Sequence, residues 1–154
     1  MNSPLPPESW TPASAAPGHA APLMESRVVA GFPSPAEQYV ERPLSLDELL
    51  VRHPVATYFV RAEGDSMLGA GIRPGDLLVV DRSLDPASGS IVIACVDGDF
   101  TVKSFVRDAS GAVRLEAANP AYPPIVFRDG MELQVFGVVT AVVHRFVEGG
   151  GAPS

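Results

Sequence analysis

Ser66 is a candidate nucleophile. It lies in Gly64-Asp65-Ser66-Met67, shortly after a β-type run that ends at Arg61. A serine just past a tight turn can expose its hydroxyl while neighbouring backbone N–H groups point the same way. The N–H of Ser66 and that of Asp65 or Met67 could then form an oxyanion hole. A serine after Gly-Asp is also a common turn or helix-cap residue, so these residues alone leave catalysis open.

Lys103 is a candidate general base. It is the only lysine among the eleven Lys and Arg residues of the chain. Arginine keeps its proton near neutral pH, whereas a buried lysine can lose it. Strand alternation places Thr101, Lys103 and Phe105 on one face, where burial would lower the pKa of the amine. A neutral Lys103 could then take the proton of Ser66. A GC-rich genome that favours arginine codons would also explain a single lysine.

The composition of the chain argues against nucleic-acid binding and against insertion into a membrane. The chain has 154 residues, 46% of them hydrophobic, and a net charge of −7. This length predicts one domain plus a tail. The acidic balance and scattered arginines argue against direct binding to nucleic acid, which needs clustered positive charge. No apolar stretch reaches the ~18 residues of a membrane-spanning helix, and no signal peptide is apparent, so we expect a cytoplasmic protein.

The cysteine and histidine residues predict neither a disulfide nor a metal site. A single cysteine, Cys95, excludes an internal disulfide and suits a reducing compartment. It lies in an apolar run and is expected to pack in the core. The histidines His19, His53 and His144 do not have metal-ligand spacing, so no metal or cofactor is expected.

The elements that must position Ser66 and Lys103 are predicted to be mostly β-strands. Strands are expected over residues 57–61, 77–81, 90–96, 99–106, 112–117, 125–127 and 133–146, the last as one bent strand or two. Asp97-Gly98 predicts a hairpin turn. Many short strands separated by turns predict a mostly β, partly closed fold. One short helix is expected over residues 44–51, because Ser45 and Glu48 have capping-box spacing and three leucines share a face.

The chain divides into four parts by composition. Residues 1–26 form a Pro/Ala-rich tail that is expected to be disordered, and residues 147–154 are expected to fray. Residues 27–43 are predicted to be an arm, and residues 44–146 the main domain. Within the arm, the run from Val28 to Ala30 predicts an extended segment, the shape that a protease cleft binds as an added strand. A linker that happens to contain two valines is the alternative.

The order of these motifs resembles the LexA-type self-cleaving serine peptidase family, and most of all its UmuD-like members. The resemblance rests on Gly64-Asp65-Ser66-Met67, on the run Gly-Ile-Arg-Pro-Gly-Asp-Leu-Leu-Val-Val-Asp at residues 71–81, and on Thr101-Val102-Lys103. It covers roughly residues 27–146. It implies a mostly β LexA/UmuD-like fold, a Ser66/Lys103 dyad, and a homodimer. It also implies self-cleavage at Ala30-Gly31, stimulated by the RecA–single-stranded DNA filament.

The resemblance further implies a role in the SOS response. The processed dimer would be the accessory subunit of an error-prone, UmuC-like Y-family translesion DNA polymerase. Repressors of this family carry a helix-turn-helix domain before the arm. This chain has a Pro/Ala-rich tail there, so repressor activity is not expected.

Two other functions stay open from the sequence. One is a non-catalytic β-fold module that acts only as a partner-binding subunit; the lone lysine at the dyad position weighs against it. The other is a peptidase that cleaves other proteins, as signal peptidases do with a similar Ser/Lys dyad; the lack of a membrane anchor weighs against it.

Overall fold

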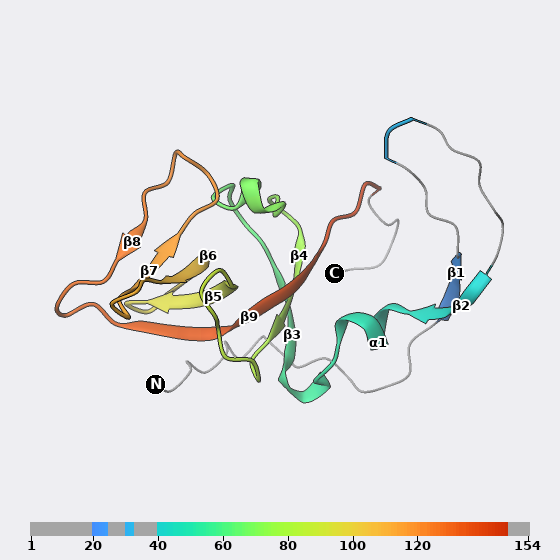
Figure 1. The fold of residues 1–154 in the computed structure, drawn as a ribbon, viewed down its shortest axis with the longest axis horizontal. Helices are drawn as coiled ribbons and strands as arrows, with labels where there is room; N and C mark the ends of the chain where they lie inside the picture. The colour runs from blue at the N-terminus through green and yellow to red at the C-terminus, as the bar shows by residue number, and fades with distance from the viewer. Residues whose placement is uncertain (1–19, 25–29, 33–39, 148–154) are drawn as a thin grey trace.

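The computed structural model describes residues 20–24, 30–32 and 40–147, and its centre is a seven-stranded antiparallel sheet (Figure 1). The strand order is β3-β4-β9-β5-β6-β7-β8, and the sheet is not closed. The strands are β3 (Thr57–Arg61), β4 (Leu77–Asp81), β5 (Ile91–Val96), β6 (Asp99–Arg107), β7 (Val113–Glu116), β8 (Ile125–Val126) and β9 (Leu133–Val143). The prediction of a mostly β, LexA/UmuD-like fold is therefore confirmed.

Strand β9 joins the two halves of this sheet. Its C-terminal part pairs with β4 and its N-terminal part with β5. The register passes over Thr140 in the first pairing and over Phe136 in the second, so each is a bulge residue. Bulges bend a strand, which explains how one strand of eleven residues crosses the molecule (Figure 1). This is the long, bent strand that the sequence predicted near residues 133–146.

The two faces of the sheet carry two apolar clusters. The first contains Tyr58, Ala62, Met67, Ile72, Leu78, Val80, Ile93 and Phe136. The second contains Val92, Ala94, Phe105 and Leu115. Strand β5 contributes Ile93 to the first cluster and its neighbours Val92 and Ala94 to the second, because successive side chains point to opposite faces. Burial on both faces explains why the sequence of β5 is a continuous apolar run; Cys95 in this strand is half-buried.

The predicted hairpin and helix cap are both present. Asp97 and Gly98 link β5 to β6 with positive φ angles of 48° and 92°, the geometry of a tight two-residue hairpin turn. Helix α1 (Leu46–Leu50) begins after Ser45, whose hydroxyl accepts a hydrogen bond from the Glu48 N–H.

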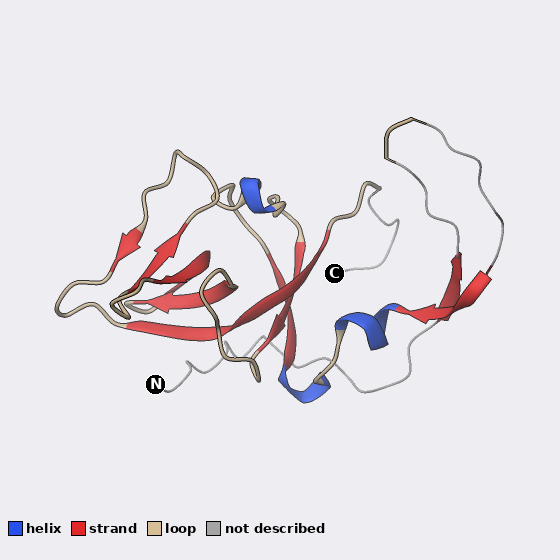
Figure 2. Cartoon of the chain, in the orientation of Figure 1, coloured by secondary structure: helices blue, strands red, loops and turns tan. Residues whose placement is uncertain are grey.

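The leucine face of α1 is largely exposed, although three leucines on one face of a helix usually indicate packing against a core. Leu46 is 59% exposed and Leu49 is 54% exposed. Figure 2 shows the helix in the connection between β2 and the main sheet. The chain also contains two short 3-10 helices. Helix η1 (Pro54–Ala56) directly precedes β3, and helix η2 (Leu68–Ala70) follows Ser66.

Residues 20–24 form a strand although the sequence placed them in a disordered tail. Strand β1 (Ala20–Met24) pairs antiparallel with β2 (Val40–Ser45), so β2 also crosses the boundary predicted between residues 43 and 44. Pro22 lies opposite Pro43 in this ladder. Proline is tolerated on edge strands, and both strands of a two-stranded sheet are edges. The prolines therefore misled the sequence-based prediction.

The rest of the predicted arm is only partly described. Residues 30–32 form an exposed bend, whereas the sequence predicted an extended conformation up to Ala30. Val28 and Val29, and all of residues 1–19, lie outside the described residues. In the described part of the chain, no helix is long and apolar enough to cross a lipid bilayer.

Candidate active site

The structure brings Ser66 and Lys103 together. Ser66 lies in the connection between β3 and η2, and Lys103 lies in the middle of β6. Although they are 37 residues apart, Lys103 Nζ donates a hydrogen bond of 3.0 Å to Ser66 Oγ. Only 8% of Lys103 is exposed. This distance is within the reach that a nucleophile and its base require.

The surroundings of Lys103 disfavour its charged form. Its amine also contacts Thr101 Oγ1 at 2.9 Å and the Val102 carbonyl oxygen at 3.1 Å. No carboxylate of the described residues forms an ion pair with it. Burial therefore lowers the pKa of Lys103 from its ordinary value near 10.5. The neutral amine, which can accept a proton from Ser66, becomes accessible at a lower pH than for an exposed lysine.

Replacing Thr101 by valine should slow any reaction that depends on Lys103. The hydroxyl of Thr101 accepts a hydrogen bond from the amine and so holds it in place. Its loss should reduce the rate about tenfold and move the midpoint of the pH–rate profile to lower pH, because the charged amine loses an acceptor. Self-cleavage rates measured from neutral pH to pH 10 would check both effects. Thr101→Ser keeps the hydroxyl and should restore the wild-type profile.

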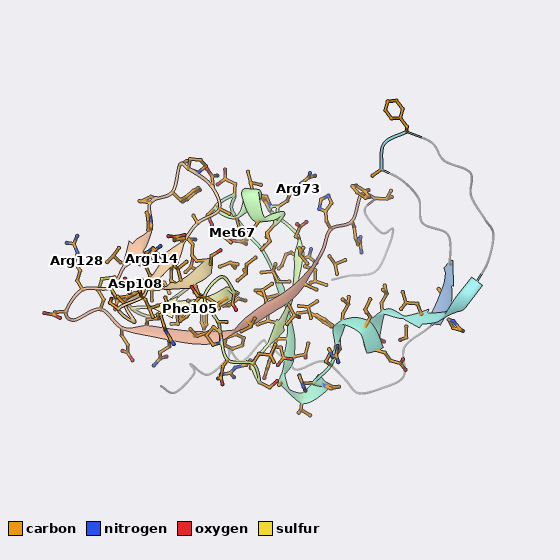
Figure 3. All side chains as sticks on the ribbon, viewed as in Figure 1. Met67, Arg73, Phe105, Asp108, Arg114 and Arg128 are labelled. Atoms are coloured by element: carbon orange, nitrogen blue, oxygen red, sulfur yellow. The ribbon has the colours of Figure 1, made fainter. Side chains whose placement is uncertain are left out.

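Apolar anchors and a backbone hydrogen bond hold the Ser66 turn. Gly64 supplies a positive φ of 76°, and Met67, next to Ser66, packs its side chain into the first apolar cluster (Figure 3). The Pro-Gly-Asp motif lies alongside, because Ala62 N–H donates to the Asp76 carbonyl oxygen. Met67 and Ala62 therefore anchor the turn on both sides of Ser66, which orients the serine.

Asp76 gives His144 a structural role that the sequence did not reveal. Its carboxylate accepts hydrogen bonds from the Arg73 N–H and from His144 Nδ1, and only 3% of the residue is exposed. Burial by itself raises the pKa of Asp76, but these two partners outweigh it and hold the pKa below its usual value. The side chain of Arg73 points outward (Figure 3), and its positive charge adds a smaller electrostatic contribution to the lowered pKa of Asp76.

Three residues that the sequence did not single out also contact the Ser66 turn. They are Ala118, Asn119 and Tyr122, from the connection between β7 and β8. Their signal in the sequence was weak, because Pro120, Pro123 and Pro124 indicated only a loop. The contact depends on long-range folding, which local patterns do not encode.

The backbone donors that the sequence suggested for an oxyanion hole are available. Among the described residues, no protein group accepts a hydrogen bond from the backbone N–H of Asp65, Ser66 or Met67. Such free donors beside a nucleophile can stabilise a developing oxyanion.

A small pocket opens beside Ser66. Its volume is about 260 Å³. The lining is Val60, Arg61, Ala62, Glu63, Gly64, Ser66, Met67, Ile72, Ile93, Phe100, Thr101 and Val102. A larger cavity of about 650 Å³ lies against the second apolar cluster and contains neither Ser66 nor Lys103. We assign the candidate active site to the smaller pocket, because Ser66 lines it and the Lys103 amine is hydrogen-bonded to Ser66 Oγ.

The predicted cleavage bond is not at this pocket. Ala30 and Gly31 lie in the exposed bend and line no part of it. Figure 1 shows this bend, the short blue segment at residues 30–32, well apart from the turn between β3 and η2. Within the described residues, no group of three or more His, Cys, Asp or Glu side chains could hold a metal ion.

Comparison of the sequence with known proteins identifies the family of this chain. A family model described as Peptidase S24-like matches residues 22–140. The chain belongs to this family. It is 50% identical over 125 residues to Protein SamA of Salmonella typhimurium, and the match covers 81% of this chain and 86% of SamA.

Other Peptidase S24-like relatives support the same placement. The chain is 43% identical over 131 residues to Protein MucA of Escherichia coli, which covers 84% of this chain and 86% of MucA. It is 40% identical over 120 residues to LexA repressor 1 of Xanthomonas campestris pv. campestris, covering 77% of this chain but 58% of the repressor. The resemblance to UmuD-like members of the LexA-type peptidase family is confirmed.

Proposed function

We propose that this chain is a serine endopeptidase that cuts its own Ala30–Gly31 bond with a Ser66/Lys103 dyad. In this proposal residues 44–146 are the peptidase domain and residues 27–43 the cleavable arm. One observation carries it: the buried amine of Lys103 lies 3.0 Å from Ser66 Oγ and has no carboxylate partner among the described residues. A structural lysine would be expected to keep its charge through an acidic partner.

The chemistry follows from these positions. Neutral Lys103 takes the proton of Ser66 Oγ, which attacks the carbonyl carbon of Ala30. Backbone N–H groups of Ser66 and of Asp65 or Met67 stabilise the oxyanion. Protonated Lys103 then gives its proton to the amine of Gly31 as that bond breaks. Water, activated by the same amine, hydrolyses the ester left on Ser66.

Cleavage must be restrained, because a tethered arm has a high effective concentration at the site. Two features provide the restraint in this proposal. Any Lys103 amine that keeps its proton cannot act as the base, and the Ala30–Gly31 bend lines no part of the pocket. Binding to a RecA–single-stranded DNA filament would favour the docked arm, which excludes water and promotes the neutral amine.

We assign the processed product to the SOS response. The cleaved homodimer would act in the cytoplasm as the accessory subunit of an error-prone, UmuC-like Y-family polymerase. Support comes from the family membership and from the 43–50% identity to SamA, ImpA and MucA over most of the chain.

The test is incubation of the protein with RecA, single-stranded DNA and a nucleoside triphosphate, followed by mass spectrometry. Ser66→Ala is treated in parallel. A fragment that begins at Gly31, in the wild type only, is the expected result. If both proteins stay intact, also at alkaline pH, the proposal fails and a non-catalytic partner-binding subunit becomes the better explanation.

Self-cleavage without the filament should accelerate as the pH rises. The fraction of neutral amine grows about tenfold for each pH unit below the pKa of Lys103. Because burial lowers this pKa, the rise should level off below pH 10.5. Rates of fragment formation at one-unit intervals from pH 7 would check this. A rate that stays flat from pH 7 to about pH 10 would rule out Lys103 as the base.

A further inference from the structure

Residues in the connection between β7 and β8 form hydrogen bonds with Asp65 and with the carbonyl oxygen of Ser66. Asn119 Nδ2 donates to the Asp65 carbonyl oxygen at 2.9 Å, and Tyr122 OH donates to Asp65 Oδ1 at 2.6 Å. Ala118 N–H donates to the Ser66 carbonyl oxygen at 2.8 Å. These partners are more than fifty residues away in sequence from the turn that they hold. We call residues 118–122 the positioning loop.

The hydrogen bond from Asn119 sets the direction of the Ser66 N–H. The carbonyl of Asp65 and the N–H of Ser66 belong to one planar, trans peptide group, so they point in opposite directions. Holding the carbonyl toward Asn119 therefore aims the N–H of Ser66 away from the positioning loop. The bond from Ala118 fixes the next peptide group in the same way. Both peptide groups that flank the Ser66 side chain are thus oriented from outside the turn.

Tyr122 holds the carboxylate of Asp65, the residue that precedes Ser66. Asp65 is exposed, and Tyr122 OH is the only hydrogen-bond partner of its carboxylate among the described residues. The interaction raises the pKa of Tyr122, because the phenolic proton is held by a carboxylate. It also keeps the carboxylate turned toward the loop. A free carboxylate beside the nucleophile would oppose a developing oxyanion by repulsion between like charges.

Close backbone contact between loop and turn requires a glycine. Gly69 N–H donates to the Ala118 carbonyl oxygen at 2.7 Å. A Cβ atom at position 69 would lie 2.7 Å from that same oxygen, closer than real Cβ contacts allow. The backbone of the turn therefore contacts the positioning loop directly, and a side chain at position 69 would push the two apart.

We infer that Asn119 and Tyr122 are positioning residues for catalysis, which hold the Ser66 amide and the Asp65 carboxylate in the orientation that the oxyanion needs. The inference rests on the proposed self-cleavage. Neither residue contacts Lys103, so they act on the nucleophile turn and leave the base unaffected.

Two near-isosteric substitutions test this inference. Tyr122→Phe removes only the hydroxyl. Asn119→Asp keeps the Oδ1 atom that accepts from Ala121 N–H but replaces the donor to Asp65 by an acceptor. Each should lower the alkaline plateau of the self-cleavage rate about tenfold. The midpoint of the pH profile should stay unchanged, since the surroundings of Lys103 are intact. A shifted midpoint, or an unchanged plateau in both variants, overturns the inference.

A double-mutant cycle separates positioning from a general loss of stability. If Tyr122 acts through Asp65, Tyr122→Phe should have no further effect in an Asp65→Ala background. Tyr58→Phe is the matched control, because this buried ring lies in the first apolar cluster and its hydroxyl has no hydrogen-bond partner among the described residues. It should cleave at the wild-type rate. Additive losses in the cycle, or equal slowing by Tyr58→Phe, count against the inference.

Hydrogen exchange keeps the test independent of the proposed function. The amides of Gly69 and Ala118, which are hydrogen-bonded across the contact between loop and turn, should exchange faster in Asn119→Asp than in the wild type, while amides of β5 should not change. If the wild type does not cleave itself under any condition, the proposed function fails, and the exchange rates still decide whether the loop holds the turn. Equal exchange in both proteins would show that it does not.

Discussion

Replacing Lys103 by methionine is expected to abolish self-cleavage and to leave the folded protein at least as stable. Methionine fills a similar volume but accepts no proton, so the loss of the general base should cost about 10²–10⁴ in rate. The same change removes an amine whose charged form is disfavoured by burial. Fragment formation at alkaline pH and urea unfolding at neutral pH measure the two effects.

The stability difference should also depend on pH in a defined direction. Between the lowered pKa of folded Lys103 and the unfolded value near 10.5, the unfolded chain binds more protons than the folded one. Wild-type stability should therefore rise with pH through this window, and the advantage of Lys103→Met should shrink. Lys103→Arg is the control: it keeps a charge that cannot be lost, so it should be inactive and less stable. Cleavage by Lys103→Met within tenfold of the wild-type rate would refute the role of this amine.

Replacing Ala30 by tryptophan is expected to block processing by at least about 10²-fold, because misplacement of the scissile bond by about 1 Å has an effect of that size. The pocket beside Ser66 has a volume of about 260 Å³, and a strand-like arm must approach the serine closely. Folding should be unaffected, since Ala30 lies in an exposed bend. The measurement is the yield of the fragment beginning at Gly31.

Ala30→Ser provides the matched control for size. Serine is nearly as small as alanine, so this variant should be processed at close to the wild-type rate. Undiminished cleavage of Ala30→Trp would exclude Ala30–Gly31 as the bond. A fragment with a different first residue would move the site to another part of the arm.

The sheet was predictable because its signals are local. Alternating or continuous apolar runs marked β3 to β6, and Asp97-Gly98 marked the hairpin that places Lys103 on β6. Ser66 and Lys103 were recognisable by residue type and by their motifs. Their separation of 3.0 Å was not, because it depends on the strand order that joins the β3–β4 and β5–β6 hairpins through β9.

The pairing of β1 with β2 and the contacts of the positioning loop could not be predicted, because they also depend on residues that are far apart in the sequence. Pro22 and Pro43 argue against strands locally, yet they pair with each other in a two-stranded sheet. Asn119 and Tyr122 read as residues of a proline-marked loop, and only the fold brings them to Asp65. The exposure of Leu46 and Leu49 could not be predicted either. An apolar helix face indicates burial, but the sequence does not show which element would cover it.

The place of β9 in the strand order has a consequence for synthesis on the ribosome. Residues 133–143 are translated after both Ser66 and Lys103, yet β9 lies between β4 and β5 and is the strand that connects their two hairpins. Such long-range pairing forms only when the late strand is present. A nascent chain that has not yet emerged past residue 143 therefore holds its serine and its lysine on two unconnected hairpins. Under the proposed self-cleavage, the strand order therefore delays assembly of the Ser66/Lys103 pair until β9 has been synthesised.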